Sequence, residues 1–409
     1  MRTRTLSTSV EARWLLPVSA APIERGSVLL VDDQIVDVGL NLRGDRHVDL
    51  EDGVLMPGLV NNHTHLEFSH LQQPLGSEAS TFDAWIRAVI DERRTREVET
   101  STSVQAGLHE SERGGVMRMG EIATELALGP LQSDCQAHGV RFLELIGLSP
   151  ERQAAALATA RCYASESPPS GWQPGLSPHA PYTVGLGLLE SAVELAQTQA
   201  LPMAMHLAES RAELEFIQNR SGPFRELLES VGAWDSRAIP SGIRPSDYIQ
   251  RLAQAPRALV IHGNYLDEDS VAALVQHRET VSLVYCPRTH AFFKHDAYPL
   301  AQLLKRGVRI VLGTDSRASN PDLQVWEEAK FVAATHSQVT PQQIVEMCTT
   351  QGSAALGVPA CEIRTHQRAD LTVVRCPWHD PDPMTAILHP EAHAVSLRRV
   401  LRDGEHRAS

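Results

Sequence analysis

The sequence predicts an α/β protein: a (β/α)8 barrel with a small β domain built from both ends of the chain. Three observations support this prediction. The middle of the chain repeats a strand-loop-helix unit, both ends contain short β-rich runs, and polar residues, mostly histidines, follow several central strands. A chain of 409 residues has room for one large domain and a smaller companion. We expect these parts to span residues 1–57, 58–360 and 361–409.

The two ends of the chain contain the β-rich runs. In the first 57 residues, they occupy 14–16, 27–31 and 34–38, and turn signals such as Gly26 separate them. Near the other end, residues 369–374 and 394–401 have the same character. We therefore expect both ends to pair into one β-sandwich.

The middle of the chain alternates short apolar runs with helix-like stretches. The expected strands are 201–205, 258–261, 281–285 and 309–312, and the expected helices are 186–200, 269–277 and 323–334. This alternation indicates a parallel sheet with helices outside it, and the number of units suggests a closed barrel. An open, doubly wound sheet would have the same periodicity. Residues 219–257 are unusually long for a connection between two strands, so we expect a lid or helical insertion there.

The composition limits the class of function. A formal net charge of −13 would repel nucleic acid and anionic membranes, so a small-molecule substrate is expected. The six cysteines are scattered without a C-x-x-C pair, and no apolar run reaches the length of a signal peptide or a membrane span. We expect a cytoplasmic protein with reduced thiols.

The strongest local signal is the pair His63 and His65, which ends the segment 57–65. Alternate residues of a strand point to one side, so both imidazoles can face one metal ion. Three further apolar runs end in His206, His262 and Asp315. In a barrel, the carboxyl ends of all strands open onto one face, which favours a barrel with a metal site at that face. The alternative is that each is a core or helix-capping residue, the usual role of a single histidine among 18.

Several of these segments resemble the amidohydrolase superfamily. They are residues 57–65, His206-Leu207-Ala208-Glu209, His262-Gly263 and Leu312-Gly313-Thr314-Asp315. They are most similar to the branch of nucleoside and triazine deaminases and chlorohydrolases. The resemblance implies a distorted (β/α)8 barrel, a β-sandwich domain and one catalytic metal, with zinc expected first and iron as the alternative. It assigns His63, His65, His206 and Asp315 as the metal ligands.

The lysine content bears on the number of metals. Binuclear members of the superfamily use a modified lysine or another carboxylate on the fourth strand to bridge two metals. The only lysines here are Lys294, Lys305 and Lys330, and all of them follow His206. We therefore expect one divalent metal ion per chain.

The residue types suggest a mechanism. A divalent metal lowers the pKa of its bound water, which then attacks as hydroxide, and Asp315 can both ligate the metal and accept a proton. Glu209, three residues after His206, is expected to be the general acid, and the resemblance assigns it the same role. His262 orients the water or stabilises the developing alkoxide; its alternative is to be a further ligand. Glu213 and Glu215 are interpreted as a solvated helix face.

Five residues are candidates for substrate binding. His179 matches the end of the family's fourth strand and is expected to contact the substrate. Glu144 lies in an apolar run, so it meets either a ribose-like hydroxyl or an internal arginine. Trp85 and Phe82 stack on a heterocycle or pack in the core. Residues 286–290 read Cys-Pro-Arg-Thr-His where many relatives have Cys-Pro-x-Ser-Asn, and Arg288 in this segment could bind a substrate carboxylate as a bidentate fork.

Together these features predict a hydrolase that deaminates a purine-like nucleoside and releases ammonia. Within the superfamily, the sequence is most similar to deaminases of aminodeoxyfutalosine and of S-adenosylhomocysteine. Dechlorination or deamination of a triazine, guanine or pterin is the alternative reaction, because the same metal hydroxide would serve it. A catalytically silent relative that only binds is the alternative from another class. The expected partner is a small heterocyclic substrate, and a homodimer is the candidate assembly.

Overall fold

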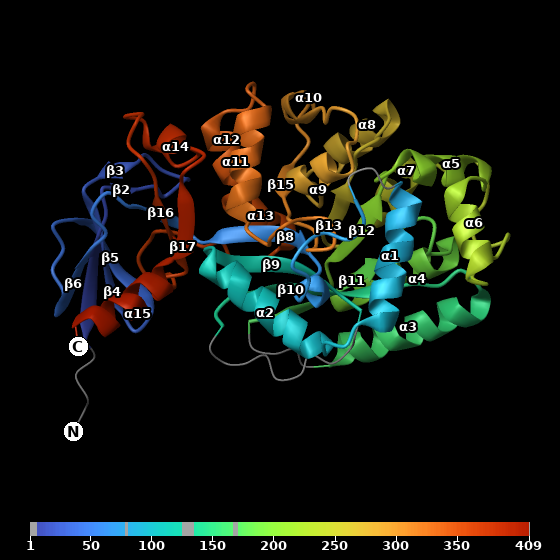
Figure 1. Cartoon of the computed structure of the whole chain (residues 1–409), viewed down its shortest axis with the longest axis horizontal. Coiled ribbons are helices and arrows are strands. Elements are labelled where there is room, and N and C mark those ends of the chain that lie inside the picture. Colours follow the sequence, from blue (N-terminus) through green and yellow to red (C-terminus); the bar gives the residue numbers. More distant parts are fainter. Residues whose placement is uncertain (1–5, 78–80, 125–134, 167–170, 409) are drawn as a thin grey trace.

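A computed structural model describes residues 6–77, 81–124, 135–166 and 171–408 of the chain. A barrel surrounded by helices makes up most of the molecule, and a small β domain lies at one end of it (Figure 1). Eight strands form the central sheet: β8 (Leu59–Thr64), β9 (Val116–Ala123), β10 (His138–Leu145), β11 (Gln173–Pro178), β12 (Met203–Leu207), β13 (Ala258–His262), β14 (Val281–Tyr285) and β15 (Ile310–Leu312).

The central sheet is parallel throughout and follows the order of the sequence. Each of the eight strands pairs in parallel with the next, from β8 to β15. An isolated parallel bridge between Thr64 and Asp315 connects the first strand to the segment after the last. The carbonyl of His63 accepts hydrogen bonds from Thr314 N (3.1 Å) and Asp315 N (3.0 Å). The predicted barrel is confirmed, and this seam nearly closes it.

Helices cover the outside of the barrel (Figure 1). They are α1 (Phe82–Thr95), α2 (Thr100–Arg113), α3 (Pro150–Ser165), α4 (Leu186–Gln199), α5 (Arg211–Asn219), α6 (Pro223–Ser230), α7 (Pro245–Leu252), α8 (Glu268–Gln276), α9 (Pro287–Phe292), α10 (Leu300–Lys305), α11 (Val325–Thr335), α12 (Pro341–Met347) and α13 (Thr350–Leu356), with a 3-10 turn, η1 (Leu66–Phe68), after the first strand. The long segment 219–257 contains α6 and α7, so the expected helical insertion is confirmed.

The small domain consists of two sheets that share one apolar core. One sheet has the order β5-β4-β1-β6 and the other β17-β16-β7-β2-β3. Their strands are β1 (Ser7–Glu11), β2 (Trp14–Leu15), β3 (Ile23–Glu24), β4 (Gly26–Val31), β5 (Gln34–Leu40), β6 (Arg46–Asp49), β7 (Val54–Pro57), β16 (Leu371–Arg375) and β17 (His393–Ser396), and a short helix, α14 (Pro383–Ala386), lies between the last two. Val10 and Val28 from one sheet pack in the same core as Leu55 and Val373 from the other. The sandwich is therefore built from both ends of the chain, as predicted.

The last predicted strand, 394–401, is wrong in its second half. The strand β17 ends at Ser396, and helix α15 (Leu397–Ala408) follows. The hydroxyl of Ser396 accepts a hydrogen bond from Arg399 N (3.3 Å), as an N-cap does. Leu397, Val400 and Leu401 then pack against the core of the small domain at helical spacing. A short run of apolar residues fits a strand or a helix, and here the N-cap at Ser396 favours the helix.

One buried ion pair joins the barrel to the small domain. Arg118 on β9 donates to the carboxylate of Asp370, just before β16, at 2.9 Å, and both side chains are buried. Because each charge would be costly to bury alone, this pair fixes how the two parts meet. Among the helices of the described residues, none is long and apolar enough to cross a membrane.

Candidate active site

Three imidazoles meet at the carboxyl end of the barrel. His63 and His65 come from the end of β8, and His206 comes from β12 on the opposite side of the sheet. One ligand atom from each lies within 4.8 Å of the others, and Nε2 of His65 is 3.4 Å from Nε2 of His206. All three side chains are buried. Strand alternation and the parallel sheet bring them together, as the sequence suggested.

Asp315 approaches the same point from the segment after β15. Its Oδ1 atom lies 3.4 Å from Nε2 of His63 and 3.7 Å from Nε2 of His65. Its other oxygen, Oδ2, accepts a hydrogen bond from the hydroxyl of Ser319 at 2.8 Å. One carboxylate oxygen is therefore directed toward the imidazoles while the second is held from behind.

The chemistry of this donor set fits a divalent metal. Burial lowers the pKa of His65 and His206 well below the usual value, so both rings are neutral and keep a lone pair. Nδ1 of His206 bonds the carbonyl of His179 at 2.9 Å, which leaves Nε2 for a metal. Ligands at zinc distances in a tetrahedron are about 3.3 Å apart, close to the separations found here.

Glu209 and His262 lie beside the imidazoles. Glu209 follows β12, His262 ends β13, and Oε1 of Glu209 is 3.3 Å from Nε2 of His262. Burial raises the pKa of Glu209 well above its usual range, and the nearby carboxylates of Asp315 and Glu213 raise it further. A raised pKa favours the protonated form of a carboxyl group, which can donate a proton. Burial also keeps His262 neutral by lowering its pKa well below the usual value.

The backbone at three of these strand ends is strained. Ala208, His262 and Asp315 have φ angles of 53°, 69° and 57°, in the left-handed region that non-glycine residues rarely adopt. Such residues persist where surrounding contacts hold them, and they concentrate at functional sites. Here they turn the chain sharply after β12, β13 and β15, so that side chains at the strand ends face the centre.

A cavity of about 230 Å³ opens onto this group. Its wall includes Trp85 and Phe82 of α1, whose ring centroids are 5.6 Å apart, and Leu227 and Leu228 of α6. Trp85 also packs in an apolar cluster with Phe68 and Val89, and its indole N–H donates to the carbonyl of Ala318 at 2.9 Å. The expected core packing is therefore present, and stacking on a heterocycle stays a prediction for two rings that line the cavity.

Glu144 and His179 also line the cavity, together with Arg93. Oε2 of Glu144 is 3.7 Å from Nη2 of Arg93, so the expected internal arginine exists. Oε1 of Glu144 has no hydrogen-bond partner among the described residues and lies 3.9 Å from Nε2 of His179. One carboxylate oxygen is thus near an arginine, and the other remains for a ligand group in the cavity.

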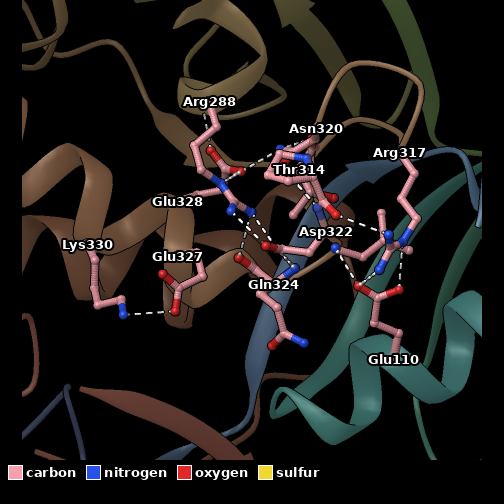
Figure 2. Close-up of polar contacts among 12 residues, drawn as sticks. Glu110, Arg288, Thr314, Arg317, Asn320, Asp322, Gln324, Glu327, Glu328 and Lys330 are labelled. Atoms are coloured by element: carbon pink, nitrogen blue, oxygen red, sulfur yellow. Dashed lines mark hydrogen bonds and ion pairs between the residues drawn. The ribbon is translucent and has the colours of Figure 1, made fainter. Parts of the chain in front are cut away.

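The expectation for Arg288 has to be corrected. Arg288 is not among the residues that line the cavity, and its guanidinium is held by the carboxylates of Asp322 and Glu328 (Figure 2). It donates to Glu328 Oε1 at 2.7 Å and to both carboxylate oxygens of Asp322 at 2.6 and 2.9 Å. The predicted partner, a substrate carboxylate, is therefore replaced by two carboxylates of the protein.

The segment that carries Asp315 is held by two such arginines. Glu328, fully buried on α11, also accepts from Asn320 Nδ2 (2.7 Å), which in turn donates to the carbonyl of Thr314 (2.7 Å). Arg317 pairs with Glu110 of α2 through two hydrogen bonds of 2.9 Å (Figure 2). These contacts tie the residues on both sides of Asp315 to helices outside the barrel.

The interpretation of Glu213 as a solvated residue is wrong. Its side chain is fully buried, and its two oxygens accept from the backbone N–H groups of Ala208 (2.7 Å) and Glu209 (3.0 Å). Glu215 is exposed and bonds Ser221, as expected of a helix face. Their spacing on α5 does not show which of the two glutamates is buried and which is exposed.

Sequence reasoning missed three further residues around the cavity. Arg93 lies on the same face of α1 as Trp85 and Val89, at intervals of four residues, and this spacing could have identified it. Tyr182 lies three residues after the predicted His179, and its ring stacks on Phe224 with centroids 3.9 Å apart. No local sequence pattern indicated that Arg152, at the start of α3, lines the cavity.

Comparison with known proteins identifies the family. The family model described as "Amidohydrolase family" matches residues 54–405. The chain belongs to the amidohydrolase family. It is thus a hydrolase that acts on carbon–nitrogen bonds, and the family is metal-dependent. The resemblance noted in the sequence is confirmed.

Three similar proteins illustrate the range of this amidohydrolase family. The aminodeoxyfutalosine deaminase of Deinococcus radiodurans is 28% identical over 322 residues, 74% of this chain and 73% of that one. The Helicobacter pylori aminofutalosine deaminase in complex with methylthio-coformycin superposes with a TM-score of 0.81 at 23% identity, over 95% and 97% of the two chains. The atrazine chlorohydrolase of Arthrobacter aurescens, complexed with zinc, has a TM-score of 0.76 at 16% identity, over 95% and 92%. The last two similarities establish the fold.

The position of Arg288 gives a testable prediction. Replacing Arg288 with Ala leaves the buried Glu328 without its cation, and breaking a buried pair in this way costs about 3–5 kcal/mol. We expect chemical denaturation to report a loss of that order. Arg278→Ala, which removes an exposed pair with Glu279, should change the stability by no more than about 0.5 kcal/mol. Unchanged stability together with a raised KM for acidic substrates would restore the substrate-binding role.

Proposed function

We propose that this amidohydrolase deaminates a purine-like nucleoside and releases ammonia, with aminodeoxyfutalosine or a related adenosine compound as the best candidate. The observation that carries the proposal is the position of Glu209. This buried carboxyl, with its raised pKa, lines the same cavity as His65, His206 and the aromatic wall. Hydrolysis of a cyclic amidine needs an acid that protonates a ring nitrogen beside the carbon under attack.

The residues of the site divide the reaction between them. When bound, a divalent metal lowers the pKa of a coordinated water and so supplies the nucleophile. His63, His65, His206 and Asp315 would hold that metal. Asp315 accepts the proton of the attacking water through Oδ1, and Glu209 donates a proton to the ring nitrogen. His262, neutral and 3.3 Å from Glu209, orients the water.

We propose that the metal is a single zinc ion, with iron as the alternative. Three imidazoles and one carboxylate are a donor set that suits either metal. The chlorohydrolase complexed with zinc supports the choice of zinc.

The residues that line the outer part of the cavity support the proposal that the substrate is a nucleoside larger than adenosine. The free Oε1 atom of Glu144 is suited to a sugar hydroxyl, and Trp85 and Phe82 offer flat surfaces to a heterocycle. Beyond them, a cleft of about 490 Å³ shares Arg93, Glu144 and Arg152 with the cavity. The exposed Arg152 takes the place that Arg288 was expected to fill, as a donor to an acidic group of the substrate.

An ammonia-release screen tests the proposed function. The panel should contain aminodeoxyfutalosine, S-adenosylhomocysteine and adenosine, with guanine, a pterin and an aminotriazine for comparison. We expect ammonia from the adenine nucleosides, and a higher kcat/KM for those that carry an acidic group, because Arg152 borders the cavity. Activity confined to guanine, pterin or triazine would contradict the proposal.

Replacing Glu209 with Gln tests the general acid. The amide cannot donate the required proton, so kcat should fall by about 10²–10⁴-fold while the metal stays bound. In the wild-type enzyme, the acid works only when protonated, so kcat should fall as the pH rises through the raised pKa of Glu209. Steady-state kinetics across pH measures both effects. Full activity of the Glu209→Gln variant would exclude this role.

Elemental analysis of the purified enzyme tests the number of metals. We expect close to one zinc or iron per chain, because the only imidazole cluster at the strand ends of the described barrel is the one around His63. The His63→Ala variant should lose the metal. His277 lies at the end of α8 and bonds Gln250, so the His277→Ala variant should retain the metal. Two tightly bound metals per chain would contradict a mononuclear site.

A further inference from the structure

Glu213 holds the backbone that carries Glu209. Its carboxylate accepts from two successive N–H groups, those of Ala208 at 2.7 Å and Glu209 at 3.0 Å. Ala208 has a left-handed φ of 53°, a conformation that lets successive N–H groups point into one concavity and bind an anion. Here the anion is a side chain of the protein itself.

An ordinary helix cap does not explain this contact. Ser210 and Glu213 have the spacing of a capping box, and Ser210 accepts from the N–H of Glu213 at 3.2 Å. In a capping box, the glutamate would return to the N–H of Ser210. Glu213 instead reaches one and two residues further back, to the turn that precedes the helix.

Burial makes this arrangement costly. Glu213 is fully buried, and burial raises its pKa to about 7 while the two backbone N–H groups lower it. No arginine or lysine pairs with it within the described ranges. A buried carboxylate without a cation is expensive to keep, so a purely structural role is a poor explanation for it.

Other contacts hold the same turn from the opposite side. Asn264 Nδ2 donates to the carbonyl of Glu209 at 2.9 Å, and Tyr265 N donates to the carbonyl of Ala208 at 3.0 Å. The backbone of Glu209 is therefore fixed at both its N–H and its carbonyl. From this fixed backbone, the side chain of Glu209 places Oε1 at 3.3 Å from Nε2 of His262.

We propose that Glu213 is a positioning residue that places Glu209 for proton donation. The inference rests on the proposed function, in which Glu209 is the general acid. A shift of about 1 Å in a reacting group can cost about 100-fold in rate, so loosening this turn should slow catalysis without weakening substrate binding.

The first experiment replaces Glu213 with Gln. The amide group can accept only one of the two N–H bonds and presents a donor to the other. We expect kcat to fall by about 10- to 100-fold, with KM and metal content unchanged. Hydrogen exchange of a peptide covering residues 207–210 should become faster, which reports the geometry without any substrate. Glu215→Gln, on the exposed side of the same helix, is the matched control and should leave every readout unchanged.

The double variant Glu209→Gln/Glu213→Gln separates positioning from a general structural effect. If Glu213 acts through Glu209, the double variant should have the same residual kcat as Glu209→Gln alone. Losses that multiply, or a fall in kcat accompanied by loss of metal and a raised KM, would overturn the proposal. So would a normal kcat and unchanged exchange in Glu213→Gln.

Two further outcomes keep the hypotheses apart. If Glu209→Gln is fully active, the general-acid assignment fails, whatever Glu213 does. If Glu213→Gln does not fold, Asn264→Ala loosens the same turn without leaving a charge unpaired. It should lower kcat in the same way, and unchanged kcat in that variant would overturn the positioning role of the turn.

Discussion

The seam between β8 and β15 is the contact on which the site depends. The carbonyl of His63 accepts from both Thr314 N and Asp315 N, and the side chain of Asn61 bonds the backbone and hydroxyl of Thr314. His63 thus contributes an imidazole to the centre and a carbonyl to the seam. The separation of its ring from the Asp315 carboxylate is set by backbone hydrogen bonds. The contacts that nearly close the barrel therefore also bring His63 and Asp315 together.

Around that seam, the buried carboxyl groups differ in what surrounds them. Asp315 faces imidazoles, Glu213 faces two backbone N–H groups, and Glu328 faces Arg288. Glu209 has only a neutral imidazole beside it, and other carboxylates nearby. In a low-dielectric site, such differences push pKa values apart and give one group the role of acid and another that of base. The arrangement of partners, more than the number of acids, assigns the chemistry.

Much of this architecture could be predicted from local patterns. Strand alternation brought His63 and His65 to one side, and the common direction of parallel strands brought His206, His262 and Asp315 to the same face. Arg288 could not be placed in this way, because its partners Asp322 and Glu328 are 34 and 40 residues away along the chain. Glu213 was misjudged because helical spacing cannot tell whether a glutamate turns outward or back toward the preceding turn. The predicted strand 394–401 was wrong in its second half for a similar reason, because the N-cap at Ser396 begins a helix in an apolar run that also fits a strand.

The pairing of β7 with β16 also constrains how the protein is made. Pro57 of β7 lies opposite Leu371 of β16, and Val54 lies opposite Val374. The strand β7 can therefore pair with β16 only after more than 300 further residues have been synthesised. At about 5–20 residues per second, a ribosome needs roughly 15 to 60 s to deliver it. During that interval, β7 has an unpaired edge, and unpaired edges recruit other chains. The nascent N-terminal segment therefore exposes this strand edge until β16 has been synthesised.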